Sequence, residues 1–127
     1  EDRAASDAGR YVWRIMIVSL AKIYCEKIKD WESFHDEFNS VFGFPDFYGR
    51  NMDAWIDCMS SLSEPDEGMT QIHCDKGKVI TIEMENVREF KSNCPELYDA
   101  LIECTAFVNW SLIEQGQQPV LSLSFNI

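Results

Sequence analysis

Positive charge is scarce in this sequence. Lysine and arginine together number 11 against 22 aspartates and glutamates, which gives the 127-residue chain a formal net charge of −11 at pH 7. The phosphates of nucleic acids and the anionic headgroups of membranes repel an acidic protein, so we expect neither direct nucleic-acid binding nor membrane binding. A basic protein is the partner that this charge favours.

The sequence also lacks a long hydrophobic run. The first apolar stretch, residues 11–21, is interrupted by Arg14 and reaches about half of the roughly 20 residues that a membrane helix needs. The ten residues before it carry three acids and two arginines, whereas a secretory signal begins with a basic segment. We therefore expect no export signal, and we expect residues 1–14 to be a flexible tail or sequence added for expression.

Cysteine pairs and metal-binding motifs are missing as well. The five cysteines form an odd set without a CxxC pair, so we expect free thiols in a reducing cytoplasm. Neither HExxH nor a glycine-rich phosphate loop occurs, and the adjacent His73 and Cys74 should point apart. We therefore expect no metal, no cofactor and no catalysis. A small cysteine or acid-base enzyme is the alternative from another functional class.

What the sequence does contain is an alternation of strand and helix patterns. β-Branched and aromatic residues predict strands over residues 15–28, 79–85 and 119–126, and apolar residues at helical spacing predict helices between them. Strands separated by helices run parallel. We therefore predict one α/β domain over residues 15–127, with a small three-stranded parallel sheet packed with about four helices in the order β-αα-β-αα-β.

Capping residues mark the ends of the first two predicted helices. Asp30 suits the N-terminal cap of the first helix, and Gly43 suits its C-terminal end. Asn51 suits the cap of a second helix, which we predict over residues 51–62 because its apolar residues follow helical spacing.

The second half of the chain continues the pattern. Residues 63–78 are rich in turn formers and predict a loop. A short helix is expected over residues 86–93, followed by a long helix that begins at Pro95 and ends before Gly116. The expected inner stripe of this long helix consists of Leu97, Leu101, Cys104, Val108 and Leu112.

Two aspartates stand four positions apart on the second predicted helix. Asp53 lies in the first turn, where a negative charge stabilises the helix by typically about 0.3 to 1 kcal/mol. Asp57 lies beyond that turn, and like charges at this spacing cost roughly 0.2 to 0.5 kcal/mol. With Arg50 and Ser60 they fall on the side opposite the apolar residues. The pattern indicates either a binding site or a solvated acidic face.

The same segment is similar to the signature of a known family. FPDFYGRNMDAWIDCMSSL, residues 44–62, resembles the barstar family, whose members are intracellular inhibitors of the ribonuclease barnase. The likeness extends more loosely from about residue 22 to the C-terminus. The residues that match the family pattern, in order, are Phe47, Tyr48, Gly49, Asn51, Asp53, Ala54, Asp57 and Cys58.

The resemblance implies a mode of binding. Members of this family plug the active site of a nuclease toxin with the second helix and the loop before it. Asp57 is then the central anchor, in the place of a substrate phosphate. We expect Gly49 to adopt a conformation that needs no side chain, so that the aromatic residues before it approach a surface closely. The resemblance places these residues around the anchor: Asp53, Phe47, Tyr48, Gly49, Asn51, Ile56 and Ser60.

Departures from the family pattern indicate that the partner can differ. Ile56 replaces an aromatic residue before the anchor aspartate, and Leu62 replaces a tryptophan. A glutamate of the last helix that faces the nuclease in the family falls near Ser111, and Glu114 can replace it only from the next turn. Residues 64–78 form an insertion, which we expect either to add a partner contact or to remain a passive surface loop.

Together these observations predict a protein inhibitor. We expect a chain that is monomeric when free and that binds a basic nuclease, most directly a ribonuclease toxin, in a 1:1 complex. Immunity to a toxin that is not a ribonuclease is the alternative within binding proteins.

Overall fold

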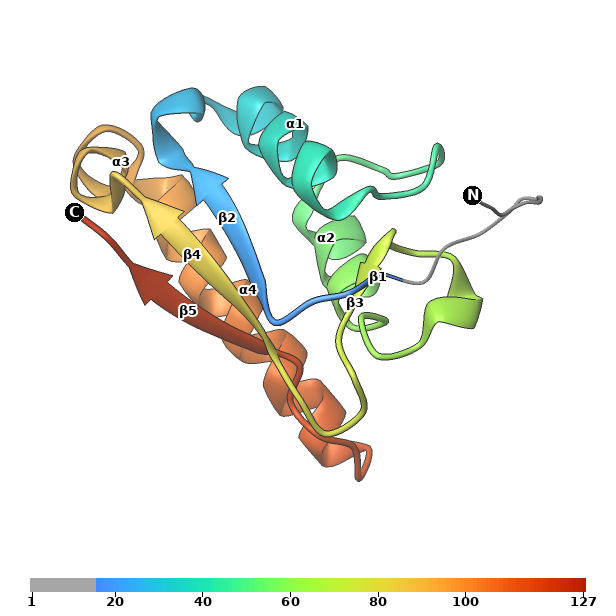
Figure 1. Ribbon diagram of the computed structural model, residues 1–127. Coiled ribbons are helices and arrows are strands. Elements are labelled where there is room, and N and C mark those ends of the chain that lie inside the picture. Colours follow the sequence, from blue (N-terminus) through green and yellow to red (C-terminus); the bar gives the residue numbers. More distant parts are fainter. Residues whose placement is uncertain (1–15) are drawn as a thin grey trace.

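A parallel sheet of three strands is the centre of the fold (Figure 1). The computed structural model describes residues 16–127, and the tail predicted over residues 1–14 lies outside them. Strand β4 (Ile80–Glu85) lies between β2 (Leu20–Tyr24) and β5 (Leu121–Phe125), and both pairs are parallel. The predicted α/β class with a three-stranded parallel sheet is confirmed.

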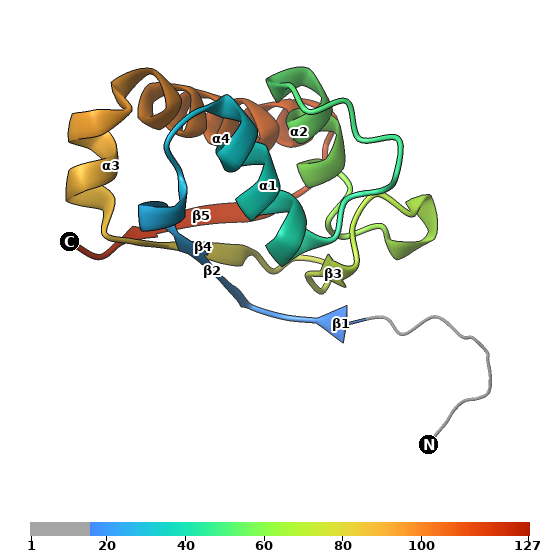
Figure 2. The same ribbon diagram turned by 90° about the horizontal axis from the view of Figure 1, so that it is seen from above.

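The helices all lie on one face of this sheet (Figure 2). Right-handed crossovers that advance in one direction across a sheet place their helices on the same face. The element order β2-α1-α2-β4-α3-α4-β5 confirms the predicted β-αα-β-αα-β arrangement. Within residues 16–127 the α-helices are α1 (Trp31–Phe42), α2 (Met52–Met59), α3 (Val87–Asn93) and α4 (Pro95–Glu114).

The opposite face of the sheet carries polar side chains. Lys22 Nζ lies 3.6 Å from Glu83 Oε1, and the hydroxyl oxygens of Thr81 and Ser122 are 2.7 Å apart. Parallel sheets usually have both faces covered. Here the alternation of buried and more exposed residues along β4 lets one face pack on the helices while the other meets water.

Aromatic side chains from α1 and α2 dominate the core. Phe34, Phe38 and Phe42 of α1 are fully buried, as are Trp55 and Met59 of α2. The ring centroids of Phe38 and Trp55 lie 5.7 Å apart in an edge-to-face arrangement, which joins the two helices. These residues belong to the apolar stripes that the sequence predicts.

The inner face of α4 differs from the predicted stripe at one position. Cys104 is only half-buried, whereas Thr105 is buried in its place. The hydroxyl of Thr105 has no hydrogen-bond partner among the described residues. The prediction used apolar residues only, and it therefore missed Thr105, because threonine is classed as polar. The other four residues of the predicted stripe are buried.

The predicted caps of α1 and α2 are confirmed. The Asp30 carboxylate accepts a hydrogen bond from Ser33 N at 2.9 Å as part of a capping box. Asn51 Oδ1 accepts from Ala54 N at 2.8 Å. Gly43 ends α1 in a left-handed conformation with φ of 70°.

The single strand predicted over residues 15–28 is wrong. The chain forms β1 (Met16–Ile17), then β2, and then a short 3-10 helix at Cys25–Lys27. The loop predicted over residues 63–78 contains β3 (Ile72–His73), which pairs with β1 as a second parallel sheet. This pairing joins segments far apart in the sequence, so the local pattern of neither segment reveals it.

All five cysteines are free thiols, and four of them are buried. We expect dithiothreitol to leave the Tm of freshly purified protein unchanged, because there is no disulfide to reduce. Thermal unfolding followed by circular dichroism with and without reductant tests this. A drop of several degrees would reveal a native disulfide, whose loss typically costs about 2 to 5 kcal/mol.

Candidate functional site

The outer side of α2 carries two carboxylates. Asp53 and Asp57 are both exposed and lie one turn apart, while Trp55, Cys58 and Met59 fill the buried side of the helix. Within residues 16–127 neither carboxylate forms an ion pair. The buried side fixes the helix in the core and leaves both carboxylates facing solvent.

Arg50, just before α2, turns away from these aspartates. Its guanidinium lies 2.8 Å from the Asp36 carboxylate and donates to the Glu32 carbonyl at 3.0 Å, so it binds α1. The expectation that Arg50 shares the outer side of α2 is therefore wrong. Arg50 precedes the cap Asn51 and has a left-handed φ of 55°, so a helical projection does not apply to it.

The two aromatic residues before α2 point in different directions. Phe47 is 76% exposed. Tyr48 is half-buried, with its hydroxyl 2.5 Å from His35 Nδ1 and its ring centroid 4.4 Å from that of Phe44. The expectation that both aromatics project is wrong for Tyr48, because its ring completes an aromatic cluster against α1. The Phe47 ring is left exposed to solvent.

Gly49 lacks the special backbone conformation that we expected. The left-handed residue of this turn is Arg50, and the φ of Gly49 lies outside that region. A Cβ added at Gly49 would lie 3.4 Å from Asn51 Nδ2 and 3.5 Å from the Ala54 Cβ. These are ordinary van der Waals distances, so neither the backbone nor the packing within this chain requires a glycine here.

Three further residues expected around the anchor support the helix. Asn51 is exposed, but its side-chain oxygen is occupied by the cap of α2. Ser60 and Ile56 are half-buried, and the Ser60 hydroxyl donates to the Ile56 carbonyl at 2.7 Å. These residues shape the backbone that presents Asp53 and Asp57.

An exposed aromatic pair on α4 was missed by the sequence analysis. Phe107 and Trp110 are 48% and 57% exposed, and their ring centroids lie 6.1 Å apart. Helix α4 packs beside α2. Burial raises the pKa of Cys104 on the same helix, with smaller contributions from the charges of Glu103 and Asp53. The sequence could have revealed this pair, because neither aromatic residue belongs to the inner stripe predicted for this helix.

The thiols and the second histidine give no support to a cysteine enzyme. Burial raises the pKa of Cys25 to about 12 and that of Cys58 to about 11, so both remain protonated at neutral pH. Burial lowers the pKa of His73, whose Nδ1 lies 3.4 Å from the Thr70 hydroxyl. In the part of the chain that the structure describes, no group of three or more ligand residues could hold a metal ion.

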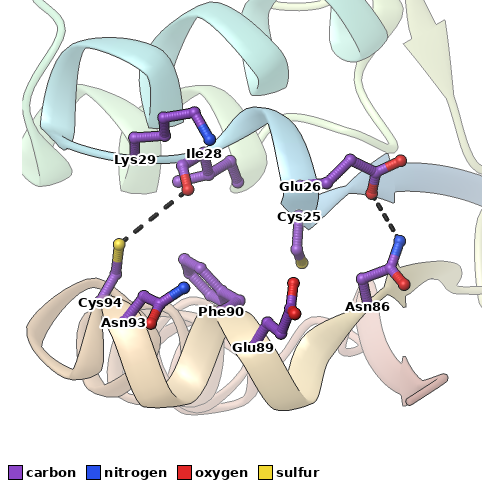
Figure 3. A pocket seen from close by; sticks show the side chains of 9 residues that line it. All are labelled: Cys25, Glu26, Ile28, Lys29, Asn86, Glu89, Phe90, Asn93 and Cys94. Carbon is purple, nitrogen blue, oxygen red and sulfur yellow. Dashed lines mark hydrogen bonds between the residues drawn. The ribbon is translucent and has the colours of Figure 1, made fainter.

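A hollow of about 360 Å³ lies at the α3 end of the molecule (Figure 3). Phe90 projects into it from α3 (Figure 3). Asn86 Nδ2 donates to Glu26 Oε1 at 2.7 Å, and Cys94 Sγ lies 4.0 Å from the Ile28 carbonyl oxygen. The side chains of Asn86 and Glu26 thus pair with each other across this hollow.

A protein-family match establishes the relationship of this chain. The family model described as barstar (barnase inhibitor) matches residues 18–124, which is most of the chain. The chain belongs to the barstar family. A search of curated proteins found no match.

Membership in the barstar family agrees with the resemblance carried by residues 44–62 and with the observed fold. The barstar family is a family of inhibitors, as its description states. The match includes α2, the loop before it and the segment over residues 63–78. No helix within residues 16–127 is long and apolar enough to cross a membrane.

Protonation of His35 is expected to make the stability of the protein depend on pH, because His35 contacts Tyr48 of the loop before α2. Burial, followed by the charge of Arg50, lowers its pKa below the ordinary value of 6.5, so the folded protein holds a neutral ring against Tyr48. As the pH falls below 6.5, His35 becomes protonated in the unfolded chain before it does so in the folded protein. The free energy of unfolding therefore decreases as the pH falls toward the lowered pKa of the folded protein.

We expect the free energy of unfolding in urea to fall between about pH 7 and pH 5.5. The fall should be smaller in His35→Asn, because its side-chain amide lies as far along the chain as Nδ1, can still hydrogen-bond the Tyr48 hydroxyl and does not titrate. An equal fall in both proteins would assign the pH dependence to other groups.

Proposed function

We propose that this chain is a cytoplasmic inhibitor that binds one basic nuclease, most directly a ribonuclease toxin, through α2 and the loop before it. One observation carries the proposal: in a chain of the barstar family, Asp53 and Asp57 face solvent from a helix whose other side is fixed in the core. The net charge of −11 supports a basic partner and speeds its encounter with the chain.

Asp57 is the proposed anchor of the complex. It lies beyond the first turn of α2, where the helix dipole gives little stabilisation, and one turn from the like charge of Asp53. A carboxylate resembles a phosphate in charge and in its acceptor oxygens, and an arginine can bind it through two parallel hydrogen bonds. Seated in the phosphate site of a nuclease, Asp57 excludes the substrate.

Phe47 and Asp53 flank this anchor. Phe47 supplies exposed apolar area from the loop before α2, and Asp53 supplies a second acceptor from the first turn of the helix. A central charged anchor surrounded by contacts that exclude water is the arrangement in which single residues dominate affinity. The other residues of the proposed surface, which position these side chains, are Tyr48, Gly49, Asn51, Ile56 and Ser60.

The same surface would serve immunity to a toxin other than a ribonuclease. Ile56 is half-buried and stands where the family pattern has an aromatic residue, which favours a partner surface unlike that of barnase. The anchor works against any enzyme whose active site binds an anionic group. The activity of the captured toxin decides between the two candidates.

The proposal predicts a separation between binding and folding in Asp57→Ala. The basic protein captured by the parent chain from a lysate of its source organism is identified, expressed alone and used for binding and activity assays. We expect Asp57→Ala to raise Kd by about 30-fold or more, since truncating a hot-spot residue costs at least about 2 kcal/mol. Its Tm should be unchanged or slightly higher, because repulsion with Asp53 is removed.

Two further variants control this result. Asp53→Ala should weaken binding less and should lower stability by about 0.3 to 1 kcal/mol through the lost interaction with the helix dipole. Asp99→Ala removes an exposed aspartate from α4 and should change neither quantity. Binding of Asp57→Ala at parental strength, or capture of no basic nuclease, contradicts the proposal.

A further inference from the structure

The segment between α2 and β4 is fixed in place rather than loose. Gln71 N donates to the Phe42 carbonyl at 2.8 Å, which ties the segment to the end of α1. The Ser61 hydroxyl donates to Glu67 Oε1 at 2.6 Å, and β3 pairs with β1. A second 3-10 helix, η2 (Pro65–Glu67), gives its first part regular structure. The segment therefore forms an ordered wall.

A hollow of about 670 Å³ lies between this wall and the loop before α2. Gly43 lines it and allows the two segments to approach, because a Cβ there would lie 2.7 Å from the side chain of Gln71. Phe44, Pro45 and Pro65 give it apolar walls from both sides. Figures 1 and 2 place both segments at the end of the molecule opposite α3.

Two exposed carboxylates line the hollow from opposite segments. Asp46 belongs to the loop before α2 and Asp66 to η2, and among residues 16–127 no lysine or arginine lines the hollow. The buried polar groups beside it are already engaged, since the Thr70 hydroxyl donates to the Ile72 carbonyl at 2.8 Å and also lies near the His73 ring. Besides these groups, the Gln71 side chain also lines the hollow, and an alkyl chain with a cationic head fits the apolar walls and the two carboxylates.

We propose that this hollow receives an arginine or lysine side chain on a projecting loop of the same basic nuclease. The inference rests on the proposed function and adds a second contact to it. Asp46 directly precedes the exposed Phe47, so the hollow is lined by the same loop that carries part of the proposed binding surface. Because one wall is built by residues 63–78, this segment selects nucleases that carry a cation at the matching position.

A matched pair of variants tests the contact with the nuclease. Asp66→Asn removes a carboxylate from the hollow, and Asp75→Asn removes one from the same segment outside it, so both change the net charge equally. We expect Asp66→Asn to raise Kd about threefold to tenfold and Asp75→Asn to raise it less than about twofold. The Tm of both variants should match that of the parent.

A second measurement uses N-acetyl-arginine amide as a probe of the free protein. We expect saturable NMR shifts at the backbone amides of Gly68 and Thr70, weaker in Asp66→Asn, retained in Asp57→Ala and absent with N-acetyl-glutamine amide. Equal Kd values for Asp66→Asn and Asp75→Asn, or no saturable shift, overturn the inference. If Asp57→Ala still loses nuclease binding in that case, the proposed function stands without this contact.

Discussion

The packing of Trp55 and Met59 into the core is the interaction on which the candidate site depends. Helix α2 has eight residues, too few to be stable as an isolated helix in water. Its fully buried face, with Trp55 set edge-to-face against Phe38, holds it in one orientation. Because Trp55 and Met59 are buried in the core, Asp53 and Asp57 on the opposite face of the helix point into solvent.

The residues just before α2 are also fixed by contacts with the rest of the domain. Tyr48 is anchored by His35, Arg50 is anchored on α1 by Asp36, and Asn51 caps the first turn. A partner that binds such a surface avoids most of the cost of ordering a loop at the interface. Phe47, whose ring is exposed, directly precedes the anchored Tyr48 in this loop.

Features set by short-range sequence could be predicted, and features set by distant contacts could not. The caps at Asp30 and Asn51 and the buried faces of the helices depend on residues within a few turns of one another. The pairing of β1 with β3 depends on residues that only the fold brings together. The site shows the same division, because the outward position of Asp57 follows from helix geometry, whereas the inward turn of Tyr48 follows from α1.

If Asp57 occupies the phosphate site of a nuclease, the inhibitor competes with the nucleic-acid substrate, and steady-state kinetics measure that competition. The activity of the captured nuclease is measured over a range of inhibitor concentrations at several concentrations of its nucleic-acid substrate. Competition for the phosphate site predicts that the apparent inhibition constant rises linearly with substrate concentration. An inhibition constant that does not change with substrate would place the inhibitor elsewhere and contradict the account.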